Sequence, residues 1–251
     1  MNIFSKTDVG LVREINQDSL DSGQLPDGSV WAVVCDGMGG ACGGDVASKM
    51  ACEIFSKRIN SSCDESMSGK YIKNMLISAV LAANSEIYDR SKSDKTLSGM
   101  GTTIVGCVVM DNVAHIVHAG DSRAYLIDGD GCKQLTTDHS VVQEWVDSGK
   151  ITQEEARTHS SKNIITRALG VNYRLDVDYT AYEMSECDML LMCTDGLSNY
   201  FTDGKIFSIV KGVPPEDICE KLVTAANDAG GSDNIAVVVI AQNCCRSEID
   251  G

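Results

Sequence analysis

Four apolar stretches, far apart in the chain, each meet an aspartate at one end. They span residues 30–35, 113–119, 189–194 and 235–241, and their aspartates are Asp36, Asp121, Asp195 and Asp233. Short apolar stretches bounded by glycine predict strands that are buried on both faces. A carboxylate at the end of such a strand is costly to bury unless a positive group meets it. Four unrelated turns would give the same pattern, but one shared cluster of carboxylates explains all four aspartates.

A cluster of carboxylates favours a particular class of ligand. Neighbouring carboxylates repel one another, so such a cluster calls for a cation that neutralises it. Oxygen ligands suit hard ions such as Mg²⁺ and Mn²⁺, with Ca²⁺ less constrained in geometry. Two such ions side by side form a centre for phosphoryl transfer or hydrolysis. The glycines in the stretch 37–44, directly after Asp36, let the backbone approach that centre closely.

The charge and the cysteines exclude other classes of function. The 251 residues carry 21 Lys and Arg against 36 Asp and Glu, and this net charge of −15 disfavours binding to nucleic acid or to an anionic membrane. The eleven cysteines include no Cys-x-x-Cys pair, so we expect neither a complete disulfide framework nor a zinc site. Because no signal peptide or membrane span is apparent, we expect a cytoplasmic protein, with a monomer as the default.

Six short motifs follow one another along the chain. They are Arg13…Asn16-Gln17-Asp18, Asp36-Gly37-Met38-Gly39-Gly40, Gly99-Met100-Gly101-Thr102-Thr103, Gly120-Asp121-Ser122-Arg123, Asp195-Gly196 and Asp233-Asn234. In order and spacing the chain resembles the metal-dependent Ser/Thr protein phosphatases, the phosphatase 2C-like family, in its compact bacterial form. The resemblance covers about residues 3–241 and therefore nearly the whole chain.

The resemblance implies a centre with two tightly bound Mn²⁺ or Mg²⁺ ions. Asp36 would bridge the two ions, and the carbonyl of Gly37 would bind one of them. Asp195 and Asp233 would complete the ligands of the other ion. A water held between the ions would then attack phosphorus directly, so that no covalent phosphoenzyme is required.

Three further residues take roles from the same resemblance. Arg13 would grip the phosphate through its bidentate guanidinium, although its local sequence alone suggests only a solvated surface cation. Asp18 would orient metal-bound water. Asp121, together with Asp195, would hold a third and weaker ion. The neighbouring Arg123 offers a plainer alternative, in which it forms a surface salt bridge with Asp121.

Other residues near the motifs receive no catalytic role. Animal members of the family carry a histidine, thought to protonate the leaving group, where this chain has Met38, so that proton would have to come from metal-bound water. We interpret all four histidines as structural residues: His115, His118, His139 and His159. No role is assigned to Cys42, close to the expected metals, or to Cys244-Cys245 in the tail.

The order of predicted elements indicates an α+β fold. Strands dominate both halves, two helices fall between early strands and two between late ones, and the resemblance implies a four-layer α-β-β-α sandwich of two antiparallel sheets flanked by helices. Asp45 is expected to cap the first helix. We predict a single phosphatase domain over residues 1–242 and a polar tail over 243–251. Within the domain, residues 137–161 read as a polar surface insertion with Trp145 and Val146 as isolated anchors.

These observations lead to one function and one alternative. We expect a phosphatase that hydrolyses phosphoserine and phosphothreonine on proteins and opposes a bacterial Ser/Thr kinase, with the insertion acting as a mobile flap that screens substrates. The alternative is a catalytically silent module of the same fold that binds phosphoproteins, but such a module has no need of Asp36, Asp195 and Asp233 together. An aspartyl-phosphate phosphatase is disfavoured because it needs an Asp-x-Asp pair after its first strand, and Asp36-Gly37-Met38 lacks the second aspartate.

Overall fold

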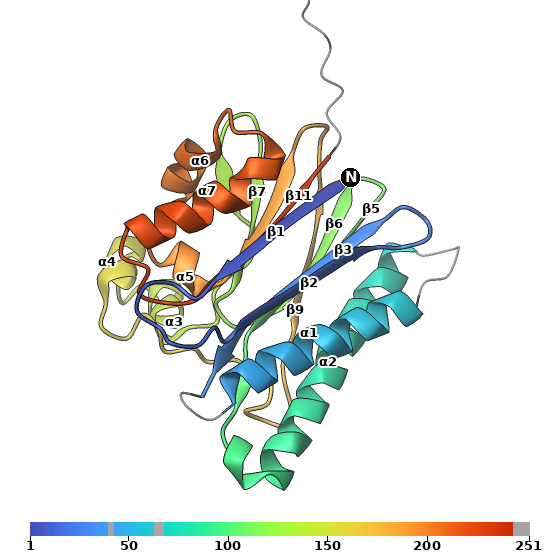
Figure 1. The fold of residues 1–251 in the computed structure, drawn as a ribbon, viewed down its shortest axis with the longest axis vertical. Helices are drawn as coiled ribbons and strands as arrows, with labels where there is room; N and C mark the ends of the chain where they lie inside the picture. Colours follow the sequence, from blue (N-terminus) through green and yellow to red (C-terminus); the bar gives the residue numbers. More distant parts are fainter. Residues whose placement is uncertain (40–42, 63–67, 243–251) are drawn as a thin grey trace, which may run out of the picture.

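Two antiparallel sheets pack face to face and carry helices on their outer faces (Figure 1). The computed structural model describes residues 1–39, 43–62 and 68–242. One sheet has the order β1-β11-β10-β7-β8, with the bounds β1 Asn2–Asp8, β7 Arg123–Ile127, β8 Cys132–Gln134, β10 Met189–Cys193 and β11 Ile235–Ala241. The other has the order β2-β3-β5-β6-β9, with the bounds β2 Asp18–Gln24, β3 Val30–Met38, β5 Ile104–Met110, β6 Val113–Ala119 and β9 Asp178–Glu183. The short strand β4 (Gly101–Thr102) also pairs with β3. The predicted fold class is therefore confirmed.

The central strands consist of uninterrupted apolar residues because both faces of each strand are buried. In β3, alternate residues point to opposite sides of the sheet. Val30, Ala32 and Val34 pack between the two sheets, while Trp31, Val33 and Cys35 pack under the helices of one outer layer. A polar residue in either set would lie in a core, so the stretch reads as one apolar run rather than as an alternation.

Two long helices cover the six-stranded sheet, α1 (Gly44–Ser61) and α2 (Gly69–Ser93) (Figure 1). The expected cap of α1 is wrong by two residues: the N-cap is Gly43 at φ 93°, a left-handed conformation, and Asp45 lies in the first turn. Glycine adopts this conformation without the strain that a Cβ adds. One face of α2 is apolar and packs in the core, and its seven buried apolar residues are Ile72, Met75, Leu76, Ala79, Val80, Ala83 and Ile87.

The five-stranded sheet has its own outer layer, formed by α6 (Asp203–Val210) and α7 (Pro215–Asp228) (Figure 1). Proline at the first position of α7 fits the helix because that position has no intrahelical N–H bond to lose. Ile218, Leu222 and Ala226 lie on one side of α7 and pack on the sheet. Together with the core between the sheets, these two layers of packing complete the α-β-β-α arrangement.

The insertion 137–161 forms two short helices, α3 (Val141–Asp147) and α4 (Gln153–Thr158), beside α5 (Asp195–Ser198) at one end of the sandwich (Figure 1). Its expected anchors are wrong, because Trp145 and Val146 are only partly buried. Val142 and Ala156 are the apolar residues buried there. A partly exposed Trp145 instead contacts the ring of His159 edge-on, with ring centroids 5.0 Å apart.

The described cysteines are mostly free thiols inside apolar surroundings. Those given as free are Cys35, Cys52, Cys107, Cys132, Cys193 and Cys219. Cys187 is disulfide-bonded. Cys42 and Cys244-Cys245 lie outside the described residues. Of the helices in the described chain, none has both the length and the apolar character that crossing a membrane requires.

Candidate active site

The strand ends that carry the four aspartates meet in one pocket. Asp36 ends the apolar run of β3, Asp121 follows β6, Asp195 begins α5 directly after β10, and Asp233 precedes β11. The pocket is lined by Arg13, Gln17, Asp36, Gly37, Met38, Gly39, Thr103, Asp121, Asn163, Ile165, Asp195, Asp233 and Asn234. Of the residues expected from the sequence, only Asp18 is absent from this lining. Asp18 lies directly beside it, because β2 pairs with β3 in a register that sets Asp18 opposite Asp36.

Burial and mutual repulsion shape the electrostatics of these carboxyl groups. Burial raises the pKa of Asp36 well above its usual value, and the charges of Asp18 and Asp195 raise it further. Burial and then the charge of Asp195 raise the pKa of Asp121 to about 8. Burial and then the charge of Asp233 raise the pKa of Asp195 to about 6. Holding these groups ionised at neutral pH therefore costs free energy unless a cation lies among them.

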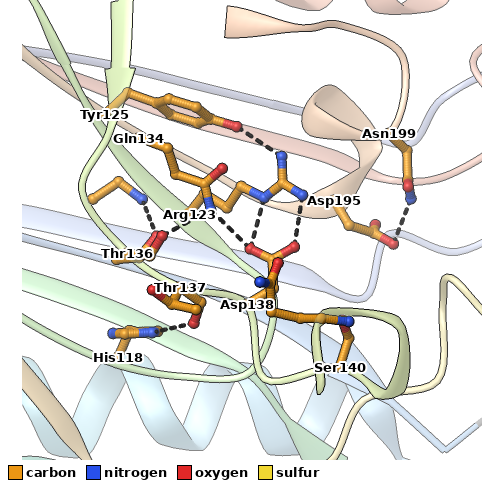
Figure 2. Close-up of polar contacts among 12 residues, drawn as sticks. His118, Arg123, Tyr125, Gln134, Thr136, Thr137, Asp138, Ser140, Asp195 and Asn199 are labelled. Atoms are coloured by element: carbon orange, nitrogen blue, oxygen red, sulfur yellow. Dashed lines mark hydrogen bonds and ion pairs between the residues drawn. The ribbon is translucent and has the colours of Figure 1, made fainter. Parts of the chain in front are cut away.

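A divalent cation fits this donor set. The Oδ1 atom of Asp195 is buried and has no hydrogen-bond partner within the described chain. Its other oxygen, Oδ2, accepts a hydrogen bond from Asn199 Nδ2 at 2.8 Å (Figure 2). An unpartnered buried carboxylate oxygen is unusual in a folded protein, and a metal ion satisfies it. Oxygen-only donors of this kind suit Mg²⁺ and Mn²⁺.

The backbone at Gly37 is packed so closely that only glycine fits there. Its N–H donates to the carbonyl of Gln17 at 3.1 Å. A Cβ at position 37 would collide with the carbonyl oxygens of Gln17 and Gly44. The glycines of this motif therefore hold the end of β3 against the start of α1, which is the close backbone approach that the sequence predicts.

Two threonines fix the main chain of Asp36 from both sides. The Asp36 N–H donates to Thr103 Oγ1 at 3.0 Å, and the Asp36 carbonyl accepts from Thr102 Oγ1 at 2.9 Å. Thr103 Oγ1 also lies 2.7 Å from Ser122 Oγ, next to Asp121. The signal that could have revealed the role of the two threonines is their place directly after the glycines of a motif.

Asp18 is a buried carboxyl group with a specific partner. Its side chain is 7% exposed, and Thr194 Oγ1 donates to its Oδ2 at 2.8 Å. The same Thr194 oxygen accepts the N–H of Ala236 at 2.9 Å. Burial raises the pKa of Asp18, and the Thr194 hydrogen bond opposes that rise. The threonine thus orients Asp18 toward Asp36 from the strand that ends in Asp195.

Arg13 lies at the edge of the pocket and is not a free surface cation. Its Nη2 forms an ion pair with Asp233 Oδ2 at 2.9 Å, while half of its side chain stays exposed. An exposed ion pair of this kind adds little stability. The guanidinium is therefore presented to the pocket, where a fork of N–H donors suits a phosphate group.

Asn234 organises the loop that carries Arg13, a role that sequence reasoning missed. Its Nδ2 donates to the carbonyls of Val9 at 2.9 Å and Ile15 at 3.0 Å. Its Oδ1 accepts the N–H of Gln17 at 2.8 Å. One buried side chain therefore ties residues 9–17 to the start of β11. Its position after Asp233 in the last motif was the only signal in the sequence.

Replacing Asn234 is expected to loosen this loop. Asn234→Ala leaves two carbonyls and one N–H without their partners, so we expect unfolding to become easier by about 2 kcal/mol. The displaced Arg13 should raise KM for a phosphopeptide about tenfold, with a smaller change in kcat. Steady-state kinetics and thermal melting check this. Asn60→Ala is the control, because Asn60 on α1 also accepts one hydrogen bond, from Trp31, far from the pocket. Equal KM effects of the two substitutions would contradict the role of Asn234.

The predicted alternative for Asp121 is wrong, because Arg123 pairs with another residue. Figure 2 shows the Arg123 guanidinium facing Asp138, with Nε–Oδ1 and Nη2–Oδ2 distances of 2.8 and 2.6 Å. Its Nη1 donates to the Tyr125 hydroxyl at 3.1 Å. Gln134 Nε2 donates to Asp138 Oδ1 at 3.0 Å and holds the acceptor in place. In the described residues no ion pair involves Asp121, and its carboxyl group stays in the pocket.

A second group of potential metal ligands is already satisfied without an ion. His118, His139 and Asp178 place ligand atoms within 4.8 Å of one another. The guanidinium of Arg167 lies among them, 2.8 Å from Asp178 Oδ1. His139 Nδ1 accepts the N–H of Gly120 at 3.1 Å, and its Nε2 lies 3.2 Å from Asp178 Oδ2 and 3.1 Å from Arg167 Nη1. Arg167 supplies the positive charge here, and the structural interpretation of these histidines stands.

Comparison with known proteins agrees with this geometry. Residues 12–233 match the family described as Protein phosphatase 2C. The chain is 36% identical to the serine/threonine phosphatase stp of Listeria innocua over 253 residues, which cover 100% of this chain and 99% of that protein. It is similar to serine/threonine phosphatase Stp1 from Staphylococcus aureus, with a TM-score of 0.90, 33% identity and coverage of 96% and 94% of the two chains. A catalytic domain of the phosphatase PstP, in complex with 2 manganese ions, gives a TM-score of 0.82 at 33% identity over 95% and 96% of the chains.

Proposed function

The chain belongs to the protein phosphatase 2C family, and from that premise we propose that Asp36, Asp195 and Asp233 hold the divalent ions of its active site. As a member of this family it is a protein serine/threonine phosphatase that acts on phosphoproteins. The observation that carries the assignment is the meeting of these carboxylates in one pocket with Arg13 at its edge. The silent binding module is not favoured, because it would have no use for such a cluster.

The proposed centre holds two ions tightly and a third more weakly. Asp36 is central to the cluster, the carbonyl of Gly37 and the carboxylates of Asp195 and Asp233 are the other ligands, and Asp121 with Asp195 serves the third ion. Divalent ions, when bound, would neutralise the phosphate and make a water molecule acidic enough to attack it. Support comes from the manganese found in PstP, a related structure, and from the buried, unpartnered oxygen of Asp195. The natural choice between Mn²⁺ and Mg²⁺ is part of the proposal.

The residues around the ions position the reactants. Arg13 binds phosphate oxygens through its exposed guanidinium and holds the ester against the carboxylates. Asp18, held by Thr194, accepts a hydrogen bond from the attacking water and fixes its direction. Met38 lines the pocket and has no proton to donate. The leaving alkoxide therefore draws its proton from water in the pocket rather than from a side chain at that position.

The insertion 137–161 is proposed as a flap on the single domain 1–242. A pocket lies between it and the catalytic residues, lined by Asp121, Asp195 and Asn199 on one side and by Val142, Ala156 and Arg157 on the other. Its first residues are tied to the core through the Arg123–Asp138 pair, and an isolated bridge joins Ser140 to Ile165. Asn163 and Ile165, which follow the insertion in the chain, line the pocket that contains Asp36. The flap is thus placed to screen substrates.

The antagonist of this enzyme is proposed to be a serine/threonine kinase that phosphorylates the same proteins in the bacterial cytoplasm, where the phosphatase would act as a monomer.

The function is tested by phosphate release from a phosphoserine or phosphothreonine peptide and from the matching phosphotyrosine peptide. Mn²⁺-dependent release from the first two, at least about tenfold faster than from the third, supports the proposal. Release from the phosphotyrosine peptide alone would refute it.

Breaking the Arg123–Asp138 pair is expected to disturb the third ion. The pair is nearly buried, with side chains 15% and 12% exposed, so Asp138→Asn should lower the free energy of unfolding by about 3 kcal/mol. The released guanidinium would turn toward Asp121, and the Mn²⁺ concentration for half-maximal activity should rise about tenfold. Calorimetric Mn²⁺ titration and melting curves measure both effects. Asp147→Asn, an acidic residue on α3 outside the pair, is the control, and an unchanged Mn²⁺ requirement in Asp138→Asn would contradict this role.

A further inference from the structure

Four large hydrophobic side chains are exposed around the pocket of the carboxylates. Leu11, Val12 and Ile15 lie in the loop that carries Arg13, with exposed fractions of 69%, 66% and 63%. Ile164, 52% exposed, lies between Asn163 and Ile165, which both line the pocket. These four make up half of the large hydrophobic residues exposed on the described chain. Single exposed apolar residues are ordinary, but a group gathered around one pocket indicates a binding surface.

The main chain beneath these side chains is fixed, so they cannot turn into the core. The N–H of Leu11 donates to the Gly231 carbonyl at 2.7 Å, and the Ile15 carbonyl accepts from Asn234 at 3.0 Å. Between two residues that line the pocket, the N–H of Ile164 donates to the Ser161 carbonyl at 3.1 Å, and the Ile164 carbonyl accepts from the N–H of Val141 at 2.9 Å. The chain thus holds Leu11, Ile15 and Ile164 in water at defined positions, which is unfavourable unless a ligand covers them.

We propose that Leu11, Val12, Ile15 and Ile164 form an apolar rim that binds hydrophobic side chains flanking the phosphorylated residue of the substrate protein. The inference rests on the proposed function, because it takes the pocket with Arg13 as the place of the phosphate. The rim adjoins that pocket at two segments, the loop that carries Arg13 and the residues Asn163 and Ile165 next to Ile164. A phosphorylated segment whose phosphate reaches Arg13 therefore has its neighbouring residues over the rim.

The occupant is an extended segment of another protein, with aliphatic side chains near the phosphorylated residue. In an extended chain, residues two positions from the phosphorylated one lie about 7 Å away along the chain, a span that suits a rim bordering the pocket. The chain as a whole carries a net charge of −15, so a strongly acidic substrate would be repelled, whereas apolar flanks add affinity without charge. A second copy of the chain is the competing occupant.

The test compares two phosphothreonine peptides that differ only at the residues two before and two after the phosphothreonine, leucine in one and serine in the other. Phosphate release gives kcat/KM for each peptide with the Mn²⁺-loaded protein. We expect the wild-type protein to prefer the leucine peptide about fivefold, since an apolar contact of this size discriminates by about tenfold when fully buried. In the triple variant Val12→Thr, Ile15→Thr, Ile164→Thr the ratio should fall close to one.

A matched control and the contrary outcomes complete the test. Leu81→Gln removes another exposed hydrophobic residue, on the outer side of α2, and should keep the fivefold preference. Equal kcat/KM of the wild-type protein for both peptides would overturn the rim, and so would a preference that survives the triple variant. Light scattering that shows a dimer in the wild-type protein and a monomer in the triple variant, without peptide preference, would assign the rim to self-association. Phosphate release from a small aryl phosphate distinguishes a failure of the rim from a failure of the proposed function. If the proposed function is wrong, the protein releases phosphate from neither peptide and not from the aryl phosphate.

Discussion

Asp36→Asn is expected to lower kcat for phosphopeptides and for a small aryl phosphate by a factor on the order of 10³ or more. Asp36 is the partly buried carboxylate that ends the apolar run of β3, and its main chain is held by Thr102 and Thr103. The amide keeps the shape of the side chain but removes the negative charge that a bridging ligand needs. We therefore expect the loss to appear in kcat for both substrates. Steady-state rates over a range of Mn²⁺ concentrations measure it.

The same substitution is expected to stabilise the chelated protein. Burial raises the pKa of Asp36, so the chelated protein binds this proton more tightly when folded than when unfolded. A group of this kind lowers stability as pH rises, and the uncharged amide removes that penalty. The melting temperature of Asp36→Asn in a chelator should exceed that of the wild-type protein at pH 7.5. Asp228→Asn, at the exposed end of α7, is the control for both readouts. A near-normal rate in Asp36→Asn would mean that the ligand assignment is wrong.

Asp121→Ala is expected to lower kcat about 10²-fold while two ions stay tightly bound. Arg123 is engaged with Asp138, so the Asp121 carboxylate remains available in the pocket. A site built on Asp121 and Asp195 has few protein ligands and should bind its ion weakly. Calorimetric titration with Mn²⁺ should therefore show the weak step in the wild-type protein and only the two tight steps in the variant. An unchanged kcat, or the loss of a tight step, would contradict the assignment of Asp121.

The carboxyl group of Asp121 is also expected to affect how the stability of the chelated protein depends on pH. Its pKa is raised to about 8, whereas an unfolded aspartate titrates near 4. The folded, chelated protein thus binds more protons than the unfolded chain between these values, and its stability should fall as pH rises from about 4 to 8. In Asp121→Ala that fall should be smaller. Melting temperatures in a chelator across this range compare the two proteins, and identical slopes would show that Asp121 is not repelled in the cluster.

The features that the sequence predicted best are those that depend on local pattern. Apolar runs such as residues 113–119 became strands because both faces of each strand are covered, and the helix α2 follows its own apolar stripe. The carboxylate cluster was also predictable, since each aspartate sits where an apolar run ends. The ends of strands in a packed sandwich meet at few places. Aspartates that recur at strand ends are therefore expected to lie close together in the fold.

The features that the sequence could not predict depend on partners far along the chain. Asn234 binds Val9 and Ile15 more than 200 residues away, and nothing near position 234 indicates those acceptors. A salt bridge between Arg123 and Asp121 was the local alternative, yet the guanidinium of Arg123, at the start of β7, binds Asp138, which lies 15 residues further along the chain. The N-cap of α1 was also not predictable from local sequence. The N-cap is Gly43 in the left-handed conformation, and the expected Asp45 lies in the first turn instead.

The most direct test of the two-ion centre is phosphate release from a small aryl phosphate by the full chain after removal of metal with a strong chelator. The small substrate bypasses the flap and the rim, so its hydrolysis reports only on the carboxylate pocket. We predict no turnover in the chelator, full recovery with Mn²⁺, weaker recovery with Mg²⁺ and inhibition by Ca²⁺, whose looser geometry misplaces the ligands. Undiminished activity in the presence of the chelator would contradict the metal-dependent mechanism altogether.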